Sequence, residues 1–224
     1  MGSDDLFRKR KARDSAALQR QKRERSRNKR YLVVCEGTKT EPYYFRELLD
    51  DLHIRPQVVR IAPNDGASPD RVVAHALALY NEDAASGDEY DMVYCVFDRD
   101  RHVTFDSAVQ RTKDLSAAGK PLLSITSTPC FEFWLLLHFG YTDSPFHSAG
   151  KKSVGDKVVA ELKTKPGFGK YGKGQKGIYA QLKDALHDAL VHAEQLRQHC
   201  AATGSVNPAT DIDKLVLALR DLRR

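Results

Sequence analysis

Short apolar segments alternate with longer amphipathic segments between residues 31 and 139, and this alternation limits the fold more than any other feature. Apolar, β-branched segments of five to eight residues are typical of strands buried on both faces. The amphipathic segments keep helical spacing. We therefore expect an α/β fold with a mostly parallel sheet covered by helices on both faces. The expected strands span 31–35, 57–62, 90–97 and 121–126, and the expected helices 42–52, 69–80, 105–118 and 130–139.

Beyond residue 140 the pattern changes to helices alone, at about 153–162, 178–200 and 212–222. We predict no further strand there and interpret these helices as packed on the same sheet. The expected organisation is a basic arm over residues 1–30, an α/β core over 31–140 and a C-terminal helical extension over 141–224.

The basic arm carries twelve Lys/Arg and four Asp/Glu, whereas residues 31–224 carry 24 and 26. With almost no apolar residue after Phe7, the arm cannot pack on a core, and we expect disorder or a solvated helix. Polycations bind nucleic acid by releasing counterions, so a phosphate-binding role is favoured over a solubilising tail or an arm for an acidic protein. The first phosphate-binding candidates are Arg8, Lys9, Arg10 and Lys11.

Several classes of protein are excluded by what the sequence lacks. It has no apolar run of the roughly 20 residues that a membrane span requires, and its first residues do not resemble a secretory signal. The four cysteines are scattered without a C-x-x-C pair, which argues against structural zinc and a disulfide framework. We expect a cytoplasmic protein that does not bind membranes.

Acidic residues follow two of the expected strands. Glu36 comes directly after the first strand, and Asp98 and Asp100 form a D-x-D pattern after the third. In a parallel sheet the carboxyl ends of the strands share one edge, where functional groups collect. Carboxylate oxygens suit Mg²⁺ or Mn²⁺. The combination predicts a metal site, although single carboxylates at such positions commonly only cap helices, as Glu41 alone would.

Two further features have both a structural and a functional interpretation. Glu132 lies within an apolar helical segment, where a carboxylate needs a partner or a metal, so it either joins the site or caps its own helix.

The Lys/Gly loop, residues 163–177, is either a solvated mobile loop or a nucleic-acid contact. In the second case Lys170, Lys173 and Lys176 would bind the nucleic acid, and Phe168 and Tyr171 would be available for stacking.

Four segments in this order resemble the RloB family of bacterial restriction and abortive-infection loci. They are VVCEGTKTEPYYFREL at 33–48, VFDRD at 96–100, PCFEFWLLLHF at 129–139 and NPATDIDKLVLAL at 207–219. The resemblance covers residues 31–222. It implies a Toprim-like fold in which a Glu after the first strand and a D-x-D after the third support Mg²⁺-dependent phosphodiester chemistry.

By this resemblance Asp98 and Asp100 are the D-x-D pair that holds the metal. Glu36 is the catalytic Glu, acting as a general base, as a proton donor to the leaving oxygen or as a direct metal ligand. Glu41 and Glu132 are candidate ligands for a second metal. Lys39 is a further candidate, for the same site and for contact with nucleic acid. No motif assigns these last three residues.

Two functions from different classes follow. The first is a Mg²⁺- or Mn²⁺-dependent nuclease of anti-phage defence that cleaves DNA or RNA. The second is a non-catalytic subunit that binds nucleic acid or a partner protein of a defence system. The presence of Glu36, Asp98 and Asp100 favours the nuclease.

Overall fold

The computed structural model describes residues 29–64, 68–99, 102–148 and 153–223. Five strands form one sheet in the order β2-β1-β3-β4-β5. The first four strands are parallel, and β5 pairs antiparallel with β4. The expected α/β fold with a mostly parallel sheet is therefore confirmed. The strands are β1 (Tyr31–Cys35), β2 (Val59–Pro63), β3 (Met92–Asp98), β4 (Leu122–Thr128) and β5 (Ala209–Thr210).

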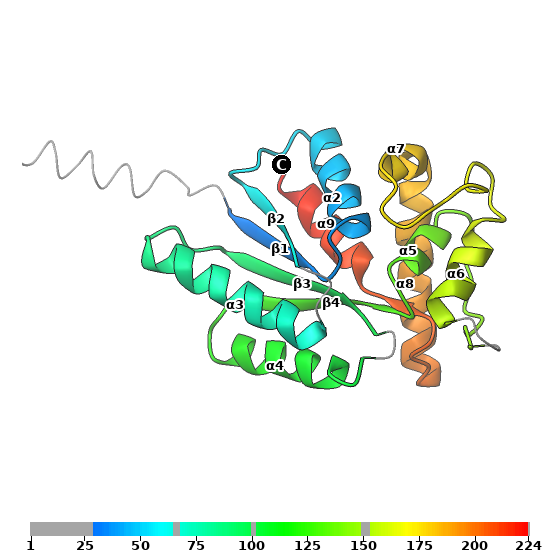
Figure 1. Cartoon of the computed structure of the whole chain (residues 1–224). Helices are drawn as coiled ribbons and strands as arrows, with labels where there is room; N and C mark the ends of the chain where they lie inside the picture. The colour runs from blue at the N-terminus through cyan, green and yellow to red at the C-terminus, as the bar shows by residue number, and fades with distance from the viewer. Residues whose placement is uncertain (1–28, 65–67, 100–101, 149–152, 224) are drawn as a thin grey trace, which may run out of the picture.

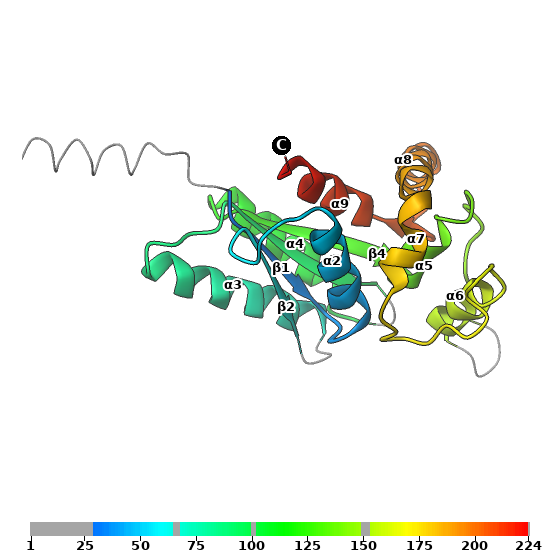
Figure 2. The same cartoon turned by 90° about the horizontal axis from the view of Figure 1, so that it is seen from above.

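Helices cover both faces of the sheet (Figure 1). In Figure 1, α2 and α9 lie on one face and α3 and α4 on the other, while Figure 2 shows α5, α6, α7 and α8 beyond the end of the sheet. The helices are α2 (Thr40–Asp51), α3 (Pro69–Ala85), α4 (Phe105–Ala117), α5 (Glu132–Leu136), α6 (Val154–Leu162), α7 (Ile178–Leu182), the 3₁₀ helix η1 (Lys183–Ala185), α8 (Leu186–Thr203) and α9 (Ile212–Asp221).

Strand β1 shows why the central strands are apolar throughout. All five of its residues are buried, and successive side chains point to opposite faces. Tyr31, Val33 and Cys35 join the core beneath α2 and α9. Leu32 and Val34 join a second core beneath α3 and α4. A strand between two helical layers has no solvent-facing side, so its sequence does not alternate with polar residues.

The structure differs from the sequence-based expectation in three elements. β5 was not expected, because two residues carry no periodicity and their strand conformation comes from pairing with β4. The helix expected at 130–139 is shorter in the structure, where α5 forms only about one and a half turns. The helix expected at 178–200 is divided by η1, which allows α7 to contact α2 while α8 contacts α5.

No helix within the described residues combines the length and apolar character needed to span a membrane.

The second core should make a large contribution to stability. We expect Leu32→Ala to lower the free energy of unfolding by about 2–5 kcal/mol, because Leu32 is fully buried between the sheet and α3 and α4. Leu217→Ala is the matched control: Leu217 is 46% exposed on α9, and its loss should change the free energy by no more than about 0.5 kcal/mol. Urea unfolding measures both. Equal effects would contradict this packing.

Candidate functional site

The carboxyl ends of β1 and β3 bring two of the expected acidic residues together. The strands pair in parallel with Cys35 opposite Val96, so the residues that follow lie side by side. Glu36 donates its backbone N–H to the carbonyl oxygen of Val96 at 2.9 Å. Its side-chain Oε2 accepts the backbone N–H of Asp98 at 3.0 Å. Glu36 therefore stabilises the end of β3 as well as presenting a carboxylate.

Two helix N-termini add the other two acidic candidates. Glu41 lies in the first turn of α2 and is 8% exposed, and Glu132 begins α5 and is 2% exposed. Negative charge in the first turn is favoured by the helix dipole. The Glu41 carboxylate packs closely on the β1–α2 turn: a Cβ added at Gly37 would lie 2.6 Å from its Oε2, so a larger residue there would have to move that side chain. The structure thus places Glu36, Glu41, Asp98 and Glu132 around one region.

This region is a small cleft of about 220 Å³ at the ends of the strands. Its walls come from the β1–α2 turn, the end of β3, the start of α5 and the Lys/Gly loop. The lining residues are Gly37, Thr38, Lys39, Thr40, Glu41, Asp98, Phe131, Glu132, Lys173 and Gly174.

The four carboxylates interact electrostatically. Burial, together with the negative charges of Glu132 and Glu36, raises the pKa of Glu41 to about 7. Burial raises the pKa of Asp98 well above its usual range, and Glu41 and Glu132 raise it further. Ionising all of these groups at neutral pH is therefore costly without a compensating cation.

The donor set fits a hard divalent cation. Glu41, Asp98 and Glu132 line the cleft, and Glu36 lies beside Asp98. The buried Oε2 of Glu132 accepts no hydrogen bond from the described residues, and its neighbour is the Lys173 ammonium at 3.4 Å. Mg²⁺ and Mn²⁺ prefer such oxygen ligands. Within the described part of the chain, no three acidic, His or Cys side chains already form a closely spaced ligand group. Asp100 lies outside the described residues, so its part in the site remains a prediction.

The Lys/Gly loop is more ordered than either sequence interpretation suggested. Phe168 and Tyr171 are buried, with Phe168 against Phe139 at 5.3 Å between ring centroids, so neither ring is available for stacking on a base. The Tyr171 hydroxyl donates to Oε1 of Glu132 at 3.3 Å. Although its glycines allow many backbone conformations, the burial of these two rings holds the loop against the cleft.

Among the lysine candidates, Lys173 joins the carboxylates. Its Nζ lies 3.4 Å from Oε2 of Glu132. The pKa of Lys173 is raised: burial lowers it, but the neighbouring acidic groups, Glu132 above all, outweigh that effect.

The other basic candidates differ in where they lie. Lys39 lines the cleft at the N-cap of α2, Lys170 is exposed, and Nζ of Lys176 lies 5.2 Å from the centre of the Tyr43 ring. The arm residues Arg8, Lys9, Arg10 and Lys11 lie outside the described residues.

Sequence reasoning did not assign two residues that contact the carboxylates. Nε2 of His102 lies 3.2 Å from Oε1 of Glu36, and the imidazole is 39% exposed. Tyr171 was interpreted only as a stacking residue. His102, four residues after Asp98, is close enough in sequence to be a proton relay, but a lone His is more often incidental and was not assigned. No sequence signal links Tyr171 to Glu132, 39 residues earlier.

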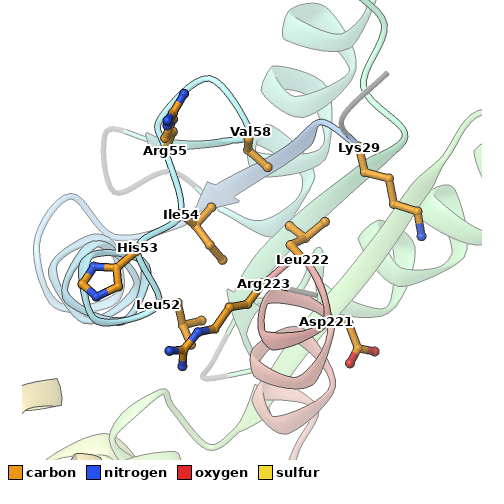
Figure 3. Close-up of a pocket in the computed structure, with 9 residues that line it drawn as sticks. All are labelled: Lys29, Leu52, His53, Ile54, Arg55, Val58, Asp221, Leu222 and Arg223. Atoms are coloured by element: carbon orange, nitrogen blue, oxygen red, sulfur yellow. The ribbon is translucent and has the colours of Figure 1, made fainter. Parts of the chain in front are cut away.

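A larger cavity of about 690 Å³ lies at the opposite end of β1 (Figure 3). It is formed by the segment before β1, the residues that follow α2, and the end of α9. Its lining mixes basic and aliphatic side chains with one carboxylate, and none of the predicted site residues lines it. The lining residues are Lys29, Leu52, His53, Ile54, Arg55, Val58, Asp221, Leu222 and Arg223. Cavity size alone therefore does not identify the site.

Comparison with known proteins agrees with the resemblance seen in the sequence. No curated protein and no solved structure matches the chain. A family model described as RloB-like protein matches residues 31–219, which include every carboxylate of the cleft. The chain therefore belongs to the RloB-like family.

Proposed function

We propose that this protein is a Toprim-type nuclease that uses Mg²⁺ or Mn²⁺ to cleave nucleic-acid phosphodiesters. The observation that carries the proposal is the contact between Glu36 and the backbone N–H of Asp98. It holds the Glu36 carboxylate against the end of β3, where Asp98 lines the same cleft as Glu41 and Glu132. Membership of the RloB-like family supports a role in bacterial defence.

Asp98 would hold the metal, with Asp100 as its D-x-D partner, and Glu41 and Glu132 lie close enough to contribute. The bound metal would stabilise the charge that develops on the phosphate and lower the pKa of a coordinated water.

Glu36 is suited to proton transfer or to metal ligation. One of its oxygens is held by the Asp98 N–H and the other faces His102, so the carboxylate has a defined orientation and a neighbour that can exchange protons with solvent. The basic arm is the proposed source of affinity for DNA or RNA, since the rest of the chain is slightly acidic.

Asp98→Asn should abolish cleavage without unfolding the protein. The raised pKa of Asp98 means that its ionised form is disfavoured in the folded metal-free state, so a neutral amide should leave the melting temperature unchanged or raise it. The measurements are melting in EDTA and Mn²⁺-dependent cleavage of plasmid DNA and total RNA. Asp114→Asn, at an exposed position of α4, is the control and should retain activity. Wild-type cleavage by Asp98→Asn would contradict the proposed site.

Glu36→Gln should reduce the cleavage rate more than metal affinity. Glutamine keeps an oxygen that can accept the Asp98 N–H but cannot transfer a proton, and loss of a general acid or base typically costs about 10²–10⁴ in rate. Mn²⁺ affinity by calorimetry and single-turnover cleavage separate the two effects. A matching loss of Mn²⁺ affinity would instead make Glu36 a direct ligand.

The stability of the metal-free protein should fall as the pH rises from about 4.5 to about 7. The pKa of Glu41 is raised from 4.5 to about 7, so its contribution to stability is present below the unfolded-state pKa and lost as the pH passes the folded-state value. Melting temperatures in EDTA test this, and Glu41→Gln should flatten the decline. Saturating Mn²⁺ should oppose it, because ionised carboxylates bind the cation. A Glu41→Gln profile identical to wild type would contradict the assignment.

A further inference from the structure

The Lys/Gly loop is fastened to α2 on the C-terminal side of Lys173. Gly174 donates its N–H to Oγ1 of Thr40 at 2.9 Å, and Gly177 donates to Oε1 of Glu47 at 2.6 Å. On the N-terminal side, the buried rings of Phe168 and Tyr171 anchor the loop. Lys173 is therefore held over the cleft by contacts on both sides.

Gly174 shows how closely the loop passes over the start of α2. Its φ is +80°, and an added Cβ would lie 2.9 Å from Cδ of Lys39. The positive φ favours glycine at this position. This close approach places the backbone of the preceding residue, Lys173, beside the start of α2, from which its side chain reaches Glu132.

The two partners in this contact differ in their exposure. The Glu132 side chain is 2% exposed, whereas that of Lys173 is 59% exposed. The ammonium group reaches the buried carboxylate from the solvent side and can leave it by side-chain rotation alone. Lys173 lines the same cleft as Glu41 and Asp98, so its positive charge acts on the cleft beyond Glu132.

We propose that Lys173 is a displaceable counter-cation: it balances the buried carboxylates while no divalent cation is bound, and a metal ion must displace it from Glu132 to load the cleft. This inference rests on the proposed function, because it concerns the metal that the nuclease would use. Release of Lys173 from Glu132 therefore favours metal binding. By linkage, metal binding favours the release of Lys173 by the same free energy.

The test is Mn²⁺ binding to the full-length protein without nucleic acid. Lys173→Met keeps much of the length of the side chain and removes its charge, so it should tighten Mn²⁺ binding by about tenfold, since a competing cation within a few ångströms is lost. It should also lower the melting temperature in EDTA and enlarge the shift that Mn²⁺ produces. Lys173→Arg keeps a cation and should remain close to wild type.

Lys163→Met is the matched control, because it removes the same charge from an exposed position of the same loop. Its Mn²⁺ affinity should stay within about twofold of wild type if the effect depends on contact rather than net charge. A metal-free double-mutant cycle of Lys173→Met and Glu132→Gln, followed by melting, should show coupling between the two residues.

Unchanged or weaker Mn²⁺ binding by Lys173→Met would overturn the displacement. An equal effect of Lys163→Met would overturn it as well, as would a cycle without coupling. Tighter Mn²⁺ binding without cleavage by any variant would support Lys173 as the counter-cation and contradict the nuclease. Failure of both wild type and Lys173→Met to bind Mn²⁺ would overturn both proposals.

Discussion

The parallel pairing of β1 with β3 is the constraint on which the rest of the site depends. It places Glu36 next to the end of β3, and the hydrogen bond from the Asp98 N–H holds the Glu36 carboxylate against the backbone of Asp98. Parallel neighbours end at the same edge of a sheet, so residues 62 positions apart in the chain come together without a dedicated loop. Helices on both faces then bury these strands.

Burial raises the free energy needed to ionise the carboxylates and strengthens their attraction for a cation. Glu41 and Asp98 have raised pKa values because they are taken out of water near other negative charges. The N-termini of α2 and α5 offset part of that cost, and Tyr171 and Lys173 offset more through Glu132. Acidic groups that are costly to ionise in this way are the physical reason for proposing metal-dependent chemistry at the cleft.

Elements from the C-terminal part of the chain complete both the sheet and the cleft. β5 extends the sheet beside β4, and Oγ of Ser127 and Oγ1 of Thr210 lie 3.1 Å apart across that pair. The residues of α7, α8 and α9 share one hydrophobic core with α2 and α5. The loop that carries Lys173 is therefore supported by packing that extends from residue 31 to residue 219, the span that the RloB-like family model matches.

The sequence by itself determined the alternation of strands and helices, the buried character of β1 and the candidacy of Glu36, Glu41, Asp98 and Glu132. These depend on local patterns: apolar runs, turn residues and acidic residues at strand ends. Only the tertiary structure decided that Tyr171 and Lys173 meet Glu132, that β5 joins β4 and that the expected stacking rings are buried. Those contacts join distant segments through packing, and a glycine-rich loop has no periodicity from which its packed conformation could be inferred.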